Sequence, residues 1–253
     1  VIPSRYHSTR LPGKPLIKIK GVEMIKRVAL IADYVCRNND DCDYIVATDN
    51  QKIEDFCVSN NLNVIMTSES CRNGTERCLD AVDRREQKTG DRPQLIINLQ
   101  GDNPLCPPWI LQDIIEEWRK DGDAAVYTPY VLLNWDEYYK MLEAKKITPF
   151  SGTTVLTDKH NNALAFSKTP IPAIRKPDEA KEKLENSPVK RHVGLYAYTY
   201  VTLKEYSSME ESVYEKNYSE GLEQMRFLYN GLRIKMVEAD YRERETTSGV
   251  DTE

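Results

Sequence analysis

Several features that mark common protein classes are missing from this sequence. No apolar run approaches the roughly 18 residues of a membrane-spanning helix, and the chain does not open with the tripartite pattern of a signal peptide. With 11 Gly and 13 Pro and 40% hydrophobic residues, the composition is neither low-complexity nor disordered. We therefore expect a globular cytoplasmic protein with a single domain over residues 1–253.

An excess of positive charge is also missing. The chain has 35 Lys and Arg against 40 Asp and Glu, so its net charge is −5. A bulk basic field that would attract nucleic acid is absent, and no segment is apolar enough to span a membrane, so we expect neither partner. Any anionic ligand must be held by a local cluster of cations.

Local metal-binding motifs are absent as well. The six cysteines form no Cys-x-x-Cys pair, and the three histidines, His7, His160 and His192, are widely dispersed. Thiolate and histidine metal sites are therefore not indicated, and we expect reduced, structural cysteines. Carboxylates remain as metal ligands, and oxygen ligands of this kind suit Mg²⁺.

The first half of the chain alternates between helical and strand patterns. The first helix has apolar residues at helical spacing, namely Ile25, Val28, Ala29, Ala32 and Val35. The apolar run at 44–47 is typical of a strand buried on both faces. Further helices are predicted at 51–60 and 75–88, and further strands at 62–66 and 95–99. Such alternation favours a parallel sheet with helical crossovers, which binds ligands beyond the carboxyl ends of its strands.

The pattern weakens after about residue 120. We predict strands at 124–132, 153–157, 162–167 and 192–199, and a helix at 218–230. Prolines and a run of charged residues make 169–190 an exposed loop or lid. Both ends of the sequence look trimmed, because it opens at the exit of a strand and stops where a turn would enter a helix.

The loop after the first strand carries the strongest local signal. Residues 1–27 contain seven Lys or Arg and one Glu, a local net charge of +6. Arg10 and Lys14 flank Gly13, which permits close backbone approach, and such a loop suits a polyphosphate. A solvated basic turn is the alternative, and the spacing is not that of a Walker loop.

Two further segments indicate ligand chemistry. Asp102 follows the strand at 95–99, where a carboxylate needs a compensating cation such as Mg²⁺, although a plain turn would give the same pattern. Residues 73–77 open a helix whose free amides and Arg77 could take an anion or a carbonyl group, unless this is a plain helix start capped by Thr75. Taken alone, His192 is expected to be structural, and Asp251 carries almost no information.

Taken in order, these segments closely resemble the 3-deoxy-manno-octulosonate (Kdo) cytidylyltransferases. The matching blocks lie at 2–16, 46–49, 73–77, 98–104, 165–168, 191–198, 222–226 and 249–252. The resemblance implies a nucleotide-diphosphosugar-transferase α/β (Rossmann-like) fold, with a mostly parallel central sheet and helices on both faces. It also implies a homodimer with a small, mainly β acceptor-binding and dimerisation region at about 124–215.

The resemblance implies an activity and a set of site residues. CMP would pass from CTP to a sugar acid with release of pyrophosphate, activating the acid for lipopolysaccharide or capsule-type glycan synthesis. The implied catalytic residues are Arg10, Lys14, Asp102 and Asp251, with Asp102 and Asp251 as Mg²⁺ ligands. The implied nucleotide-binding residues are Ser8, Arg10, Lys14, Asn73, Gly74, Arg77 and Gln100. The implied acceptor-binding residues are Gln100, Lys168, His192, Tyr196, Glu223 and Gln224.

Some positions depart from the family pattern. Asn103 stands where the family usually has Glu, Lys168 where it has Arg, and 152–155 lacks an expected lysine. Lysine replaces a planar donor fork by a point charge, so the acceptor could be a related acid, such as an amino-sugar acid or a phosphonate. A third possibility is a catalytically inactive nucleotide-binding subunit. No side chain stands out as a general base, so Lys168 and His192 are assigned to acceptor binding rather than proton transfer.

Overall fold

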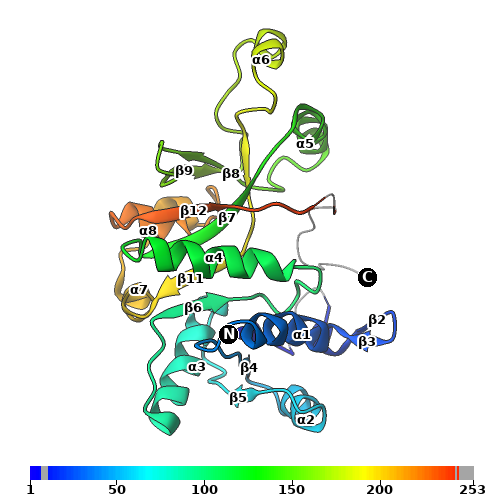
Figure 1. The fold of residues 1–253 in the computed structure, drawn as a ribbon, viewed down its shortest axis with the longest axis vertical. Helices are drawn as coiled ribbons and strands as arrows, with labels where there is room; N and C mark the ends of the chain where they lie inside the picture. Colours follow the sequence, from blue (N-terminus) through cyan, green and yellow to red (C-terminus); the bar gives the residue numbers. More distant parts are fainter. Residues whose placement is uncertain (7–10, 243, 245–253) are drawn as a thin grey trace. The chain divides into compact units, whose positions relative to one another are not determined.

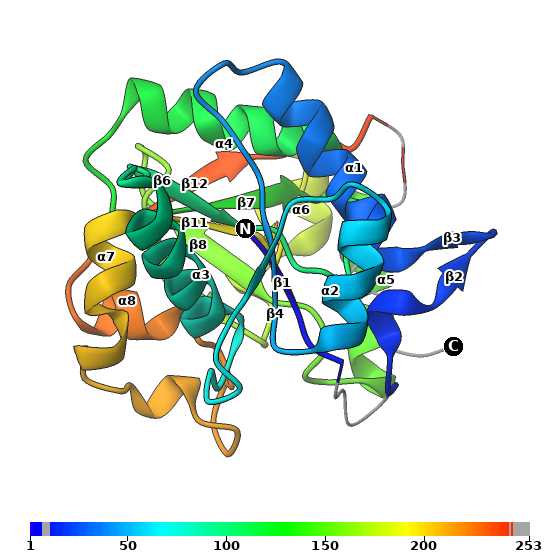
Figure 2. The ribbon, with the colours of Figure 1, turned by 90° about the horizontal axis from the view of Figure 1, so that it is seen from below.

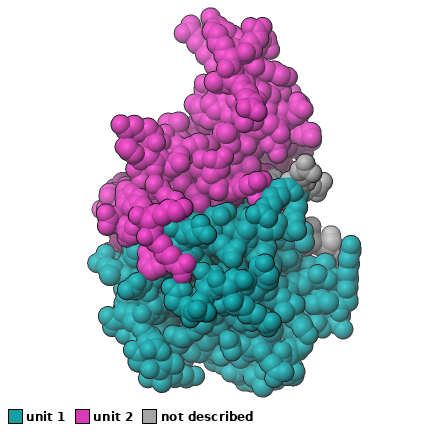
Figure 3. All heavy atoms as spheres, in the orientation of Figure 1, with its two compact units in different colours: residues 1–116, 195–207, 241–253 teal, residues 117–194, 208–240 magenta. Residues whose placement is uncertain are grey.

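The computed structural model describes residues 1–6, 11–242 and 244. Ser8, Arg10 and Asp251 therefore lie outside the described residues. The chain divides into two compact units (Figure 3). Unit 1 comprises residues 1–116, 195–207 and 241–253, and unit 2 comprises residues 117–194 and 208–240.

Unit 1 is built on a parallel sheet with the strand order β1-β4-β5. Its strands are β1 (Ile2–Ser4), β4 (Val46–Thr48) and β5 (Val64–Met66), and its helices are α1 (Met24–Arg37), α2 (Gln51–Ser59) and α3 (Gly74–Thr89). Every residue of β1 and β4 is buried, as expected for strands covered on both faces. Figure 2 shows α3 on one side of these strands and α1 and α2 on the other. The predicted alternation in the first half of the chain is confirmed.

Strand β6 (Leu95–Asn98) lies beside β1. The amino group of Val1 donates to the carbonyl of Ile97 at 2.8 Å, and the amide of Leu99 donates to the carbonyl of Val1 at 3.0 Å. The chain thus runs outward from β1 through β4 to β5 and returns through α3 to β6. A reversal of this kind is the topological switch point, where α/β sheets bind ligands. Strand β11 (Tyr196–Thr199) pairs antiparallel with β6.

Unit 2 contains a mixed sheet. Strand β7 (Val126–Leu132) runs parallel to β12 (Ile234–Glu238) and antiparallel to β10 (Lys190–His192). The antiparallel strands β8 (Thr154–Thr157) and β9 (Ala163–Ser167) follow beyond β10. The helices of this part are α5 (Trp135–Ile147), α6 (Pro177–Lys183) and α8 (Met225–Tyr229). A capping box of Asn134 and Glu137 fixes the start of α5.

The remaining elements are short or connect these parts (Figure 1). They are β2 (Lys18–Ile19), β3 (Val22–Glu23), α4 (Pro108–Lys120), α7 (Tyr200–Glu205) and the 3₁₀ turns η1 (Lys14–Leu16), η2 (Tyr206–Ser208) and η3 (Val213–Glu215). All six cysteines are free in the structure. Among the helices of the described residues, none combines the length and the apolar character needed to cross a bilayer.

Some predicted element boundaries are wrong. The strand predicted at 192–199 is two strands, β10 and β11, separated by residues 193–195. The helix predicted at 218–230 is limited to α8, because Gly221 adopts a left-handed φ of 64° that interrupts helical geometry. The segment 169–190 contains α6, which has no buried residues.

Candidate active site

The loop after β1 returns to its starting point. The amide of Gly13 donates to the carbonyl of Tyr6 at 2.9 Å, which joins the two ends of the loop. Gly13 has a φ of 72°, in the left-handed region, and a Cβ there would lie 3.4 Å from the ring of Tyr6. The left-handed φ is what favours glycine here, because the contact with the ring is an ordinary van der Waals distance. The return brings Lys14, the next residue, into η1.

The structure brings Lys14 and Asp102 together. The Lys14 ammonium donates to a carboxylate oxygen of Asp102 at 2.7 Å. The side chain of Lys14 is only 11% exposed, whereas that of Asp102 is 38% exposed. A cation and an acid that the sequence placed in separate loops thus meet beyond the ends of β1 and β6.

Gly101 explains how the backbone after β6 can lie against β1. A Cβ at this position would be 2.5 Å from the hydroxyl of Ser4 and 2.8 Å from the carbonyl of Pro3. Contacts this short do not occur in real side chains, so any other residue would push the loop away. Ser4 is buried, and its hydroxyl has no hydrogen-bond partner among the described residues. The close approach fixes the position of Asp102 through the backbone.

The start of α3 lies beside the same strand ends. Asn73 caps the helix by accepting a hydrogen bond from the amide of Glu76 at 2.8 Å. The cap is therefore Asn73 and not Thr75, the cap of the plain-helix alternative. A Cβ on Gly74 would lie 3.5 Å from the amide nitrogen of Gln100, which itself donates to Asn98 at 3.1 Å. Two of the predicted nucleotide-binding residues, Gly74 and Gln100, are thus neighbours.

Arg77 is buried inside unit 1. Its guanidinium donates to the hydroxyl of Thr67 at 2.6 Å and to the carboxylate of Asp49 at 2.5 Å. Its side chain is 1% exposed, and its Nε has no partner among the described residues. Arg77 therefore ties α3 to the segments that follow β4 and β5. Its assignment to nucleotide binding stays a prediction, because these donors are engaged within the protein.

His192 lies in unit 2 beside β7. One ring nitrogen is 2.8 Å from the hydroxyl of Thr128, and the ring meets Phe166 edge to face at a centroid distance of 5.1 Å. Burial, together with the positive charge of Lys168, lowers the pKa of His192 to about 3. The imidazole is therefore neutral near pH 7, which suits hydrogen bonding and not charge pairing.

Lys168 follows β9 in the same unit. Its amide donates to a carboxylate oxygen of Glu220 at 2.7 Å, and the other oxygen of Glu220 accepts from the hydroxyl of Ser167 at 2.9 Å. Burial lowers the pKa of the Lys168 ammonium, and the charge of Glu220 opposes that effect. The sequence did not single out Glu220, because nothing in its local pattern distinguishes it from a surface acid.

The remaining acceptor-side residues are divided between the units. Tyr196, in unit 1, stacks with Tyr198 at a centroid distance of 6.1 Å. Glu223 and Gln224 precede α8 in unit 2, and Gln224 is buried. The structure describes each group within its own unit, so their convergence on one ligand stays a prediction.

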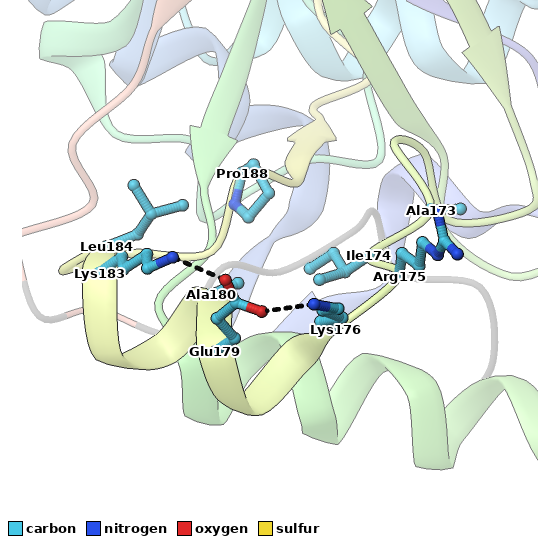
Figure 4. Close-up of a pocket in the computed structure, with 9 residues that line it drawn as sticks. All are labelled: Ala173, Ile174, Arg175, Lys176, Glu179, Ala180, Lys183, Leu184 and Pro188. Carbon is cyan, nitrogen blue, oxygen red and sulfur yellow. Dashed lines mark hydrogen bonds and ion pairs between the residues drawn. The ribbon is translucent and has the colours of Figure 1, made fainter.

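Unit 2 also contains a shallow pocket of about 460 Å³ beside α6 (Figure 4). Its lining includes Glu179, which forms ion pairs with Lys176 at 3.0 Å and with Lys183 at 2.6 Å. None of the predicted site residues is part of this lining. Arg175, Lys176 and Lys183 outnumber this single acid, so the lining carries a net positive charge.

The donor set near Asp102 bears on the predicted magnesium site. Across residues 1–6, 11–242 and 244, no group of three or more His, Cys, Asp or Glu is arranged to hold a metal ion. Asp102 offers a partly exposed carboxylate at the strand ends. Mg²⁺ commonly binds one or two carboxylates and keeps several waters, so a single exposed carboxylate fits this ion.

Comparisons with known proteins identify the family. A family model described as cytidylyltransferase matches residues 1–234. The chain is 42% identical to 3-deoxy-manno-octulosonate cytidylyltransferase of Maricaulis maris, covering 98% of this chain and 90% of that protein. It is 37% identical to the protein of that name in Parabacteroides distasonis, covering 100% of this chain and 92% of that protein.

Solved structures agree with this grouping. A structure of CMP:2-keto-3-deoxy-manno-octonic acid synthetase complexed with CTP matches with a TM-score of 0.82 and 32% identity, covering 99% of this chain and 91% of that one. A Leptospira borgpetersenii cytidylyltransferase shares the fold, with a TM-score of 0.57 and 15% identity over 99% and 79% of the two chains. The predicted fold class is confirmed, and the chain belongs to the cytidylyltransferase family, among the 3-deoxy-manno-octulosonate cytidylyltransferases.

Proposed function

We propose that this protein transfers CMP from CTP to Kdo and releases pyrophosphate. The observation that supports this most directly is the pairing of Lys14 with Asp102 beyond the ends of β1 and β6. The relatives matched over nearly their whole length carry names that specify this transfer. The CMP-linked acid would be the activated sugar for lipopolysaccharide or capsule-type glycan synthesis.

The chemistry requires fixed positive charge. A hydroxyl that attacks the α-phosphate of CTP approaches a polyanion, and the departing pyrophosphate gains charge as its bond breaks. We assign Lys14, together with Arg10, to the triphosphate and the leaving group, because preorganised cations lower the energy of that developing charge. Lys14 would then exchange its bond with Asp102 for contacts with phosphate oxygens.

Asp102 and Asp251 would hold magnesium, which when bound shields the phosphate charges from the attacking oxygen. For Asp102, the exposed carboxylate and the rigid backbone at Gly101 support this assignment. Asn73, Gly74 and Gln100 would contact the cytidine side. Ser8 is assigned to the triphosphate with Arg10.

The acceptor side is assigned to binding and not to proton transfer. A His192 pKa of about 3 makes its imidazole a poor base near pH 7. Lys168 supplies a positive charge for the carboxylate of the acid. Gln100, Tyr196, Glu223 and Gln224 would bind the hydroxyl groups of the sugar.

A second acceptor is a specific alternative, because Lys168 replaces the usual arginine. An ammonium tolerates several orientations of an anion, whereas a guanidinium fork holds one plane. An amino-sugar acid or a phosphonate would suit such a site. Lys168→Arg should then raise kcat/KM for Kdo relative to the other acids, with little change in KM for CTP.

The deciding experiment measures pyrophosphate release with CTP, Mg²⁺ and a panel of acids. We expect release with Kdo that exceeds release with each other acid, and little release when ATP or GTP replaces CTP. Preference for a different acid would overturn the Kdo assignment but keep the enzyme class. No CTP-dependent release with any acid would favour an inactive nucleotide-binding subunit.

We also propose a homodimer in the cytoplasm, as the family resemblance implies. Size-exclusion chromatography with light scattering should give about twice the 29.2 kDa mass of the chain. A mass of one chain at micromolar concentration would contradict the dimer.

A further inference from the structure

Lys145 of α5 lies in a cage of backbone carbonyl groups in unit 2. Its ammonium donates to the carbonyl of Ser151 at 2.7 Å, of Gly152 at 3.3 Å and of Lys168 at 2.5 Å. No carboxylate of the described residues lies within ion-pair distance of Lys145 or Lys168. The ammonium therefore joins the end of α5 to the turn after β9 through carbonyl groups and without a direct ion pair.

Glu220 binds the backbone amide of Lys168, whereas Lys145 binds the backbone carbonyl of the same residue. The amide of Lys168 donates to Glu220 at 2.7 Å, so a carboxylate binds the N–H and an ammonium binds the C=O of one residue. The hydroxyl of Thr154 shares its single proton between the carbonyls of Ser167 at 3.2 Å and Thr169 at 3.0 Å. Hydrogen bonds to charged groups are stronger than those between neutral groups, so the backbone of Lys168 is closely fixed.

The charges around this turn do not balance. Lys145 and Lys168 carry positive charge, Glu220 carries the negative charge, and His192 is neutral near pH 7 because its pKa is lowered to about 3. Burial lowers the pKa of both lysines, and the charge of Lys168 contributes to the shift at Lys145. An anionic ligand at Lys168 would supply the missing negative charge.

We infer that Lys145 and Glu220 are positioning residues that fix the backbone of Lys168, so that its ammonium is presented to the carboxylate of the acceptor acid. This inference rests on the proposed function, since it assigns Lys168 to the acceptor. Lys145 and Glu220 act through Lys168 and need no contact with the acid. Their loss should weaken acceptor binding without altering the binding of CTP.

The test compares Lys145→Met and Glu220→Ala with matched controls. Lys146→Met changes the neighbouring residue, which is exposed and paired with Glu143, and Glu182→Gln changes an exposed acid of α6. We expect KM for the acceptor acid to rise about tenfold in both test variants, with KM for CTP unchanged and the controls like wild type. Glu220→Gln, which keeps an acceptor oxygen for the Lys168 amide, should restore most of the affinity.

A double-mutant cycle distinguishes positioning from a general structural role. In a Lys168→Ala background, Lys145→Met should raise KM for the acid no further, because both changes remove the same interaction. Independent, multiplying effects would overturn the inference, as would a parallel rise in KM for CTP with a lower Tm. If Lys168→Ala itself leaves KM for every acid unchanged, the acceptor assignment of the proposed function fails instead.

Discussion

The ammonium of Lys14 and the carboxylate of Asp102 are 2.7 Å apart, although the two residues are separated by 88 positions in the sequence. The pair neutralises a largely buried cation. A bound triphosphate would offer Lys14 stronger partners and would release the carboxylate to a metal. The ion pair therefore holds both groups at the ends of β1 and β6, where we propose that the nucleotide binds.

Asp102→Asn should retain the fold and lose turnover. The carboxylate is partly exposed and the new amide keeps its shape, so stability should change little. Removing one element of preorganised charge typically costs about 10²- to 10³-fold in rate. Pyrophosphate release should stay low at every Mg²⁺ concentration, while Asp91→Asn, an exposed control, behaves as wild type. Turnover within a few-fold of wild type would refute the role of Asp102.

Lys14→Ala should weaken CTP binding. The loss should shrink as salt rises, because screening reduces the attraction that the lysine supplies in the wild-type protein. Calorimetry at low and high salt measures both effects, and Lys18→Ala, whose side chain is 64% exposed, is the control from the same segment. Equal CTP affinity in wild type and Lys14→Ala would make this lysine purely structural.

Arg77→Met should destabilise the protein. Removing one partner of a buried ion pair leaves the other charge uncompensated, at a cost of about 3–5 kcal/mol in the free energy of unfolding. Urea unfolding of Arg77→Met, Asp49→Asn and the double variant should show a smaller loss in the double variant than the sum of the singles. A loss below about 1 kcal/mol for Arg77→Met would contradict this structural role.

His192 should make stability depend on pH below neutrality. Its folded pKa of about 3 lies below the ordinary value of 6.5, so the unfolded chain takes up a proton first as pH falls. The contribution of the neutral imidazole to the free energy of unfolding is complete above pH 6.5 and declines as pH falls toward 3. It amounts to about 2 kcal/mol lost by pH 5, at about 1.4 kcal/mol per pH unit.

Urea unfolding at pH 7 and pH 5 measures this change in the free energy of unfolding. His192→Asn should lose less stability between these values than wild type, whereas His160→Gln, an exposed control, should follow wild type. An identical pH dependence in His192→Asn and wild type would show that the imidazole carries no such linkage.

The parallel part of the fold could be predicted from the sequence because its strands are buried on both faces and its helices are amphipathic. Helix α5 was missed because its apolar residues do not form a single stripe, although its two buried residues, Trp135 and Tyr138, share one face. The helix predicted at 218–230 failed because apolar spacing at Leu222, Met225 and Leu228 says nothing about the backbone at Gly221. The spacing of apolar residues predicts which residues are buried, but it does not reveal where the backbone leaves helical geometry.

The residues of the candidate site could be predicted where they belong to a recognisable local sequence motif. Lys14 and Asp102 each had a local signal, and the structure brings them together. The burial of Arg77 was not predictable, since its partners Asp49 and Thr67 come from other loops. The one sequence feature that pointed to Asp49 is its position directly after a buried strand. Lys145 and Glu220 lacked any such signal, because their contacts depend on how distant segments pack.

Gly101 sets a limit on how this enzyme could be redesigned. Since a methyl group at this position would collide with Ser4 and Pro3, Gly101 cannot be replaced without displacing the loop after β6. If Gln100 and Asn73 contact the cytidine side as proposed, libraries that aim at a different nucleobase would hold Gly101 constant and vary these two residues. In such a scheme Lys14 and Asp102 stay unchanged, so base recognition would be varied separately from the residues proposed to handle the phosphates.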